Sequence, residues 1–315
     1  MNAVRLHQRG GPEQLVYEDA PRPIPGPGDA LVRVHACAIT RDELTWGTTY
    51  TDPQGGERLP SIPGHEIAGV VEALARDVVE PAVGSAVYGL TDFRRDGGAA
   101  ELMVVRAADL APQPASLSPV EVAAVPLAAL TAWQALFDHA QLARGQRVLI
   151  HAAAGGVGTY AVQLARWRGA FVIGTARAAN APFLRGLGAD EVVDYSVDRF
   201  EDKVHDVDVV LDALGGDTLA RSWGVVRKGG TLVTIADSAP ADTAARYGVR
   251  GVDFIVEPNR TQLIEIARLI DAGTLRPVVA ETFPLREARR AFERSASGHN
   301  RGKVVLEVSD AVTGR

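Results

Sequence analysis

The chain has 315 residues, of which 46% are hydrophobic and 23% are charged, a balance that excludes a disordered chain or a small stapled scaffold and predicts two globular domains. The formal net charge is −6, from 33 basic and 39 acidic residues with no long basic tract, so we expect no nucleic-acid partner. A single cysteine, Cys37, excludes an internal disulfide and favours the cytoplasm. We expect no signal peptide and no membrane-spanning segment.

Residues 1–117 consist of short strand-like runs separated by turn residues. The runs lie at 15–17, 30–35, 67–72, 86–89 and 102–105. Their alternation and the spacing of the turns predict a mainly β domain.

From about residue 118 the pattern changes to Ala/Leu-rich helical segments that alternate with strand-like runs. The runs lie at 147–151, 171–174, 191–193, 207–212, 230–235 and 252–256. Six such runs predict a doubly wound parallel sheet, buried on both faces, over residues 118–258. Residues 259–315 contain an amphipathic helix at 262–271 and a strand-like run at 302–308, and we expect this segment to return to the first domain. The fold class is therefore α/β.

A glycine turn lies between the first of these runs and the helix that follows it. Gly155 and Gly158 leave the backbone accessible, so the helix N-terminus can offer its N–H groups to a pyrophosphate, although Ala153 replaces the first glycine of the usual pattern. About twenty residues further on, an NAD site usually carries a carboxylate, whereas this chain has Arg177. An arginine can pair with a 2′-phosphate, which favours NADP(H). The alternatives are a purely structural turn and a solvated arginine.

Four motifs in this order carry a resemblance to the medium-chain dehydrogenases/reductases, and within them to the zinc-independent quinone oxidoreductases. They are PGHEIAGVV at 63–71, PLAALTAW at 126–133, HAAAGGVG at 151–158 and DALGG at 212–216. The resemblance implies a GroES-like mainly β domain made from both chain ends, a Rossmann domain between them, NADPH in the cleft, and a homodimer.

The resemblance also raises the question of zinc. Zinc-dependent relatives use a cysteine, the histidine of the G-H-E motif, and a second cysteine or an acid. Here Thr40 stands at the first cysteine position, Cys37 lies three residues too early, and Leu127 takes the other position. A catalytic zinc needs three protein ligands, so we interpret His65 and Glu66 as a motif retained without a metal.

The resemblance indicates which residues meet substrate and cofactor. The catalytic candidates are Thr40, Asp42, Glu43, Trp46 and Tyr50. Thr40 and Tyr50 would donate to the substrate oxygen, Trp46 would form an apolar wall, and Asp42 or Glu43 would relay a proton if burial raised its pKa. Each could instead be a turn, cap or loop residue, and the asparagine common at position 40 in quinone oxidoreductases is absent. The expected cofactor contacts are Thr131, Ala154, Gly155, Gly156, Val157, Gly158, Thr175, Arg177, Tyr195, Leu214, Phe254, Ile255, Val256, Asn300, Arg301 and Lys303.

Together these features predict an NADPH-dependent, zinc-independent oxidoreductase. It would transfer hydride to a small-molecule quinone or an α,β-unsaturated ketone or aldehyde, with hydrogen-bond donors in place of a Lewis acid. Two alternatives stay open: a zinc-type alcohol dehydrogenase or carbonyl reductase, and a biosynthetic protein that binds NADPH without redox chemistry.

Overall fold

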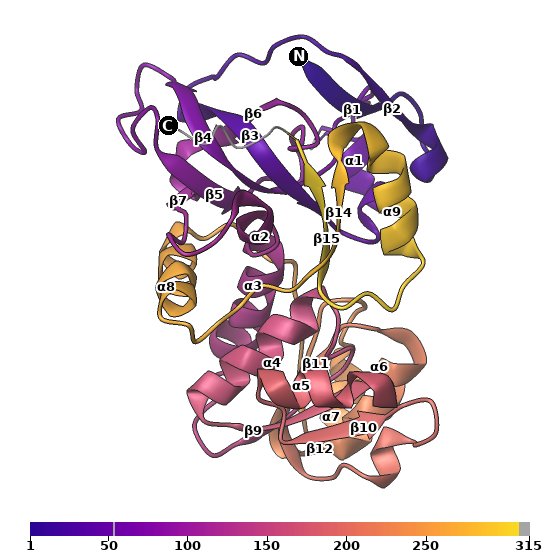
Figure 1. Cartoon of the computed structure of the whole chain (residues 1–315). Helices are drawn as coiled ribbons and strands as arrows, with labels where there is room; N and C mark the ends of the chain where they lie inside the picture. Colours follow the sequence, from indigo (N-terminus) through magenta and orange to yellow (C-terminus); the bar gives the residue numbers. More distant parts are fainter. Residues whose placement is uncertain (53, 309–315) are drawn as a thin grey trace. The chain divides into compact units, whose positions relative to one another are not determined.

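A computed structural model describes residues 1–52 and 54–308 (Figure 1). The chain divides into two compact units. The first contains Met1–Leu127, Pro258–Gly273 and Pro277–Arg315, and the second contains Ala128–Glu257 and Thr274–Arg276. The boundary therefore lies at 127/128 where the sequence suggested 117/118, and the chain enters the second unit again at 274–276.

The first unit is built around a seven-stranded sheet, with strands in the order β14-β15-β3-β4-β5-β7 and with β6 also paired to β3. Its strands are β3 (Asp29–Ile39), β4 (Glu66–Leu74), β5 (Ala86–Leu90), β6 (Leu102–Arg106), β7 (Ala111–Pro112), β14 (Val279–Pro284) and β15 (Lys303–Glu307). A separate hairpin joins β1 (Asn2–Leu6) to β2 (Leu15–Asp19). The sheet thus combines both ends of the chain, as expected for residues 302–308.

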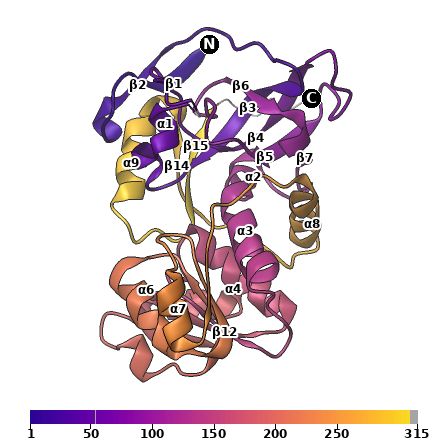
Figure 2. The same ribbon diagram turned by 180° about the vertical axis from the view of Figure 1, so that it is seen from behind.

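The helices of this unit are short apart from two near the C-terminal end. They are α1 (Gly47–Tyr50), α2 (Pro119–Ala123), α8 (Arg260–Asp271) and α9 (Ala288–Ala296), while α3 (Pro126–Trp133) spans the boundary between the units. Helix α9 lies along β14 and β15 in both views (Figures 1 and 2) and buries Phe292 in a core with Ile39 and Leu306. The antiparallel pairing of β15 with β3 sets Val304 opposite Ile39, and this register positions the polar cluster described below.

The second unit is a six-stranded sheet in the order β10-β9-β8-β11-β12-β13, with every pairing parallel. The strands are β8 (Arg147–Ile150), β9 (Phe171–Ala176), β10 (Glu191–Asp194), β11 (Val207–Asp212), β12 (Val226–Thr234) and β13 (Arg250–Asp253). Helices α4 (Gly156–Arg168) and α5 (Ala181–Leu187) cover the face of the sheet seen in Figure 1. Helices α6 (Gly216–Ser222) and α7 (Ala241–Tyr247) are seen in the opposite view, Figure 2. This is the doubly wound arrangement predicted from the sequence, and it confirms the α/β class.

Two expectations for this sheet were wrong in detail. The edge strands β10 and β13 are partly exposed, because each has a neighbour on only one side. Strand β13 also ends at Asp253, so residues 254–256 lie beyond the sheet and are not its last core strand.

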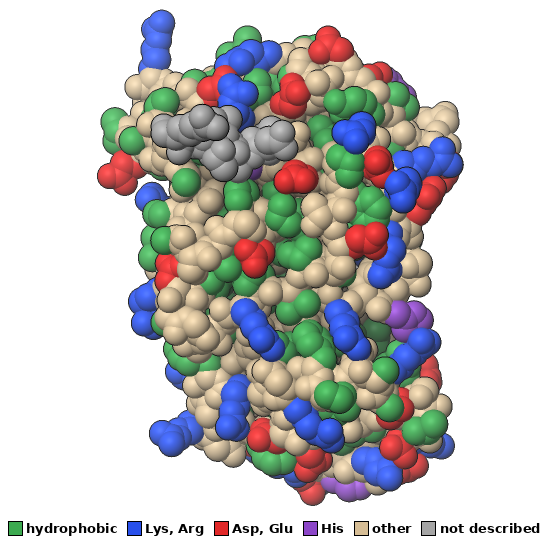
Figure 3. Space-filling model, viewed as in Figure 1, with side chains coloured by type: hydrophobic (Ala, Val, Ile, Leu, Met, Phe, Trp, Pro, Cys, Tyr) green, Lys and Arg blue, Asp and Glu red, His purple; other side chains and the backbone are tan. Residues whose placement is uncertain are grey.

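Within the described residues, no helix combines the length and the apolar character needed to cross a membrane. On the face shown in Figure 3, acidic and basic side chains are interspersed and do not separate by sign.

Candidate functional site

The glycine turn of the second unit leads from β8 into α4, which begins at Gly156 with Gly155 as its N-cap residue. A Cβ on Gly158 would lie 2.3 Å from the Ala152 carbonyl oxygen and 2.7 Å from backbone atoms of Ala153. Only glycine therefore allows the helix to start this close to the strand. The first N–H groups of a helix have no partner inside it, and here they follow a parallel strand, the usual position of a pyrophosphate site.

Three other expected cofactor contacts of this unit lie at the carboxyl ends of parallel strands, and therefore at the same edge of the sheet. Thr175 is at the end of β9, Leu214 follows β11, and Phe254 follows β13. Strand order reverses between β8 and β11, and ligands of open α/β sheets bind at such a switch point, outside the carboxyl ends of the strands. Leu214 and Ile255 are exposed there, whereas Val256 and Thr131 are buried.

The loop that carries Leu214 is held by Asp212, a fully buried residue that the sequence analysis did not select. Its carboxylate accepts hydrogen bonds from the N–H groups of Leu214 and Gly215, at 3.2 and 2.9 Å, and from Thr234 Oγ1 at 2.9 Å. An acid at the end of a strand, three residues before the glycine pair Gly215-Gly216, could have suggested this role.

Thr175 belongs to a buried chain of hydrogen bonds. Ser222 Oγ donates to the Thr218 carbonyl at 2.7 Å, so it accepts from His151 Nε2 at 2.9 Å. His151 Nδ1 is therefore the acceptor for the Thr175 hydroxyl at 3.1 Å. Burial lowers the pKa of His151 to about 3, so this imidazole is neutral at physiological pH. The Thr175 hydroxyl thus points into the protein, and contact with a cofactor would use its backbone.

Arg177 is exposed directly after β9, and the strand pairing brings an acid beside it. Asp194 lies opposite Ala176 in the β9/β10 register. Its carboxylate accepts from Ser196 Oγ and N at 2.6 and 2.9 Å and from Ala178 N at 3.0 Å, contacts that lower its pKa. Asp194 was not expected here, because it lies at the end of β10 and not directly after β9; the parallel pairing of neighbouring strands could have suggested it. Tyr195 follows it and is also exposed.

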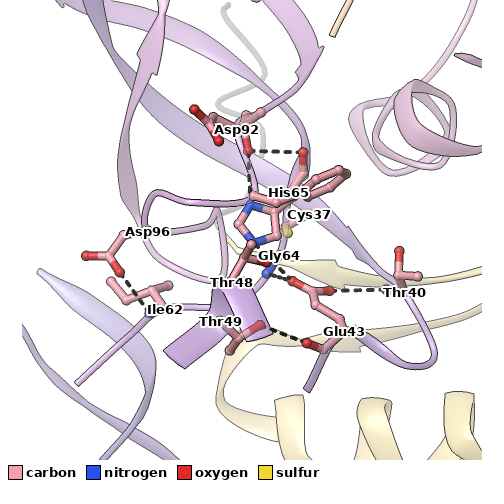
Figure 4. A network of polar contacts seen from close by, with 12 residues as sticks. Cys37, Thr40, Glu43, Thr48, Thr49, Ile62, Gly64, His65, Asp92 and Asp96 are labelled. Atoms are coloured by element: carbon pink, nitrogen blue, oxygen red, sulfur yellow. Dashed lines mark hydrogen bonds and ion pairs between the residues drawn. The ribbon is translucent and has the colours of Figure 1, made fainter. Parts of the chain in front are cut away.

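The first unit contains a buried polar cluster formed by Glu43, His65, Glu66 and Lys303, each at most 7% exposed. The Glu43 carboxylate lies between two backbone donors, accepting from Gly64 N through Oε1 and from Thr40 N at 3.3 Å through Oε2 (Figure 4). His65 Nε2 lies 3.7 Å from Glu43 Oε1, and His65 Nδ1 lies 3.3 Å from Thr91 Oγ1. Glu43 therefore ties the end of β3 to the start of β4.

Burial moves the pKa values of Glu43 and His65 in opposite directions. Desolvation raises the pKa of Glu43 to about 7, although its backbone hydrogen bonds favour the charged form. Desolvation, with a contribution from the charge of Arg58, lowers the pKa of His65 to about 3. The histidine is thus neutral at physiological pH, and the glutamate titrates close to neutrality.

Lys303 and Glu66 form the other half of the cluster. Lys303 Nζ makes an ion pair with Glu66 Oε1 and donates to Thr40 Oγ1 at 3.3 Å. Glu66 Oε2 accepts from Leu127 N at 3.1 Å. Lys303 was expected at the cofactor, but its ammonium group lies inside this cluster beside a candidate catalytic hydroxyl.

The remaining candidates lie in different environments. Asp42 is exposed, and Tyr50 is buried with its hydroxyl donating to the Leu44 carbonyl at 2.6 Å, which argues against the expected donation to substrate. Asn300 Nδ2 donates to the Ser295 carbonyl at 3.3 Å beside α9, and Arg301 is exposed.

Trp46 is part of an aromatic group that the sequence analysis recognised only in part. Its ring lies 6.3 Å from that of His65 and 5.0 Å from that of Phe93, in an edge-to-face arrangement with Phe93. His65 and Phe93 are also edge to face, at 5.3 Å. Phe93 follows β5 in a loop without a recognisable motif, so no signal in the sequence identified it.

A GroES-like sheet made from both chain ends, joined to a Rossmann unit with a glycine turn, defines the class of nicotinamide-dependent medium-chain enzymes. Two family models match the chain: an alcohol dehydrogenase GroES-like domain over residues 26–115 and a zinc-binding dehydrogenase domain over residues 187–306. The chain belongs to the medium-chain dehydrogenase/reductase superfamily, which confirms the resemblance inferred from its motifs.

Individual relatives are similar over nearly the whole chain. A probable zinc-binding mitochondrial oxidoreductase of Arthroderma benhamiae is 35% identical, covering 91% of this chain and 92% of the relative. A 2-haloacrylate reductase of Burkholderia is 32% identical, covering 96% and 98%. The structure of a quinone oxidoreductase from Coxiella burnetii matches with a TM-score of 0.89 and 31% identity, covering 98% and 99%.

These relatives support an oxidoreductase with a nicotinamide cofactor and a small-molecule substrate. Several others carry the name NAD(P)H oxidoreductase, mitochondrial, which supports the cofactor class but gives no support to the cytoplasmic location that we expected.

One of the two family models describes a zinc-binding dehydrogenase, so the side chains that could bind zinc are considered next. Within residues 1–52 and 54–308, no three or more His, Cys, Asp or Glu side chains are placed to share a metal ion. Thr40 contacts the Lys303 ammonium, and burial raises the pKa of the Cys37 thiol well above its usual value. A threonine that contacts an ammonium group, a leucine and a single histidine do not supply the three protein ligands that a catalytic zinc needs.

Proposed function

We propose that the protein is an NADPH-dependent oxidoreductase that transfers hydride to a quinone or to an α,β-unsaturated ketone or aldehyde without a catalytic zinc. The observation that carries the proposal is the hydrogen-bonded cluster around Thr40, which supplies a hydroxyl and a positive charge where zinc-dependent relatives hold a metal. The name quinone oxidoreductase among the relatives supports the quinone, and the name 2-haloacrylate reductase, whose substrate is an α,β-unsaturated carboxylate, supports reduction of a conjugated double bond.

In this proposal, separate residues bind the cofactor, donate a hydrogen bond to the substrate and contact its flat face. NADPH, when bound, supplies the hydride. The N–H groups at the start of α4 bind its pyrophosphate, and Arg177 binds the 2′-phosphate. The Thr40 hydroxyl donates a hydrogen bond to the substrate oxygen, where negative charge develops as hydride arrives at the conjugated carbon or the quinone. Trp46 and Phe93 offer an aromatic surface for a flat substrate.

The activity is tested by mixing the purified protein with NADPH or NADH and a panel of quinones, enones and simple ketones. We expect loss of NADPH absorbance with a quinone or an enone, no effect of a chelator, and zinc far below one ion per chain by elemental analysis. If NADPH binds but no substrate is reduced above background, the proposed activity is wrong. Stoichiometric zinc, with activity lost to chelation, would establish the zinc-type alternative.

The preference for NADPH is tested with Arg177→Ala, with Arg185→Ala as a control because Arg185 is also exposed and its removal changes the charge equally. A hydrogen bond to a charged group contributes about 1.5 to 3 kcal/mol, so Arg177→Ala should weaken NADPH about 10- to 100-fold and leave NADH unchanged. The control should alter neither dissociation constant. Equal losses for both cofactors would show that Arg177 does not bind the 2′-phosphate.

We also propose, from the family resemblance, that the protein is a homodimer. Light scattering coupled to size-exclusion chromatography gives the mass directly, and a monomer mass across the working concentration range would exclude it.

A further inference from the structure

The backbone around Lys303 fixes the positive charge of this side chain beside Thr40. Because β15 pairs with β3 so that Val304 faces Ile39, the residue before Val304 lies next to the residue after Ile39. Gly302 is in the left-handed region at φ +79°, and a Cβ there would lie 1.9 Å from the Val278 carbonyl oxygen. The N–H of Lys303 donates to that same carbonyl at 2.9 Å, so the start of this side chain is closely held.

The charged end of Lys303 is held as firmly as its start. The side chain is 7% exposed, and a buried ammonium group requires an opposite charge. Glu66, 1% exposed, supplies that charge, and its other oxygen accepts from Leu127 N at 3.1 Å. The charge of this ammonium group offsets part of the rise that burial gives to the pKa values of Glu43 and Cys37, so it also acts on these two neighbouring groups.

The remaining contact of the ammonium group determines whether the Thr40 hydroxyl donates or accepts a hydrogen bond there. Lys303 Nζ donates to Thr40 Oγ1 at 3.3 Å, and an ammonium group can only donate. The Thr40 oxygen is therefore an acceptor in this contact, and its own hydrogen remains for another acceptor. A hydroxyl that accepts from a cation is polarised and becomes a stronger donor.

We propose that Lys303 is a positioning residue that acts on the substrate through Thr40, directing and strengthening the hydrogen bond that this hydroxyl donates to the reacting oxygen. The proposal rests on the proposed function, because it assigns how Thr40 meets the substrate. Loss of the Lys303 charge should lower mainly kcat, because the negative charge on the substrate oxygen grows in the transition state.

The test is a double-mutant cycle with Lys303→Met, Thr40→Val and the double variant, assayed with NADPH and the best substrate of the wild type. We expect Lys303→Met to lower kcat about tenfold or more in the wild-type background and less than about twofold when residue 40 is valine. The dissociation constant for NADPH should change less than about threefold, and Lys303→Arg should recover part of kcat. Lys228→Met, at an exposed lysine, is the control and should change nothing.

Two results would overturn the inference. An equal loss of kcat in both backgrounds would show that Lys303 does not act through Thr40. A loss of NADPH affinity that matches the loss of activity would show that the ammonium binds the cofactor. If Lys303→Met lowers the melting temperature because Glu66 loses its ion pair with Lys303, the same cycle is run with Glu66→Gln added to every member. A wild type that reduces no substrate would overturn the proposed function and this inference with it. If the wild type is active but the effects of the two substitutions on kcat are additive, only the inference is overturned.

Discussion

Replacing Gly158 by alanine is the most direct test of the nucleotide site, because the structure provides a matched control a few residues away. The new Cβ of Gly158→Ala would lie 2.3 Å from the Ala152 carbonyl oxygen, with backbone on that side and no flexible side chain to move. In Gly155→Ala the nearest atom is the same oxygen at 3.2 Å, and φ is −76°. The two variants add the same methyl group, but only the first forces the strand and the helix apart.

The expected magnitude follows from the overlap. Restoring an ordinary contact requires a backbone displacement of about 1 Å, and overpacking of this kind costs about 1 to 3 kcal/mol of stability. A shift of about 1 Å also stretches hydrogen bonds from the helix N-terminus to phosphate beyond their usual limit of about 3.5 Å. Losing two such bonds at about 1.5 kcal/mol each corresponds to about a 100-fold weaker NADPH complex.

The assay is titration of NADPH by fluorescence or calorimetry, together with urea unfolding of each variant without cofactor. Gly158→Ala should bind about 100-fold more weakly than wild type, whereas Gly155→Ala should stay within a few fold. Wild-type affinity in Gly158→Ala, or equal losses in both variants, would refute the reasoning that the close approach of α4 to β8 creates the site.

Three further predictions concern buried groups and the aromatic wall. The raised pKa of Glu43 means that the folded protein holds this proton more tightly than the unfolded chain, so its stabilising contribution is complete below about pH 4.5 and is lost as the pH rises through about 7. Glu43→Gln should remove about 3 kcal/mol of this pH dependence, measured by urea unfolding across that range, and an unchanged slope would contradict the assignment. Ser222→Ala should cost about 1 to 3 kcal/mol of stability by leaving the buried His151 N–H without an acceptor, and an unchanged urea midpoint would count against the inferred tautomer. Trp46→Ala should raise KM for aromatic quinones about tenfold while leaving kcat within a few fold, and equal effects on a small enone would remove the aromatic wall from the explanation.

The features that follow local patterns could be predicted from the sequence. Each of the six strand-like runs of the middle segment overlaps a strand of the parallel sheet, although the last strand ends at Asp253, because such strands are continuous apolar runs. The Gly155–Gly158 turn has the predicted position between strand and helix for the same reason.

The features that depend on pairing between distant segments could not be predicted. Strand β14 and the contact of Lys303 with Thr40 and Glu66 depend on the register of β15 against β3, which no local pattern specifies. Asp194 meets the loop after β9 only through the β9/β10 pairing. From its residue type and its place in the chain, Tyr50 was expected to donate a hydrogen bond to the substrate. In the structure its hydroxyl donates to the Leu44 carbonyl instead, and this contact depends on how a short helix packs.

The pairing of β15 with residues 36–39 of β3 also has a consequence for biosynthesis. A ribosome makes β3, with Thr40 and Glu66 soon after it, long before it makes Lys303. Until then one segment of β3 is an open sheet edge, and the Glu66 carboxylate lacks its ion-pair partner. We therefore expect the first unit to complete its fold only at the end of synthesis, so that truncations ahead of β15 yield chains prone to aggregation rather than weakly active enzyme.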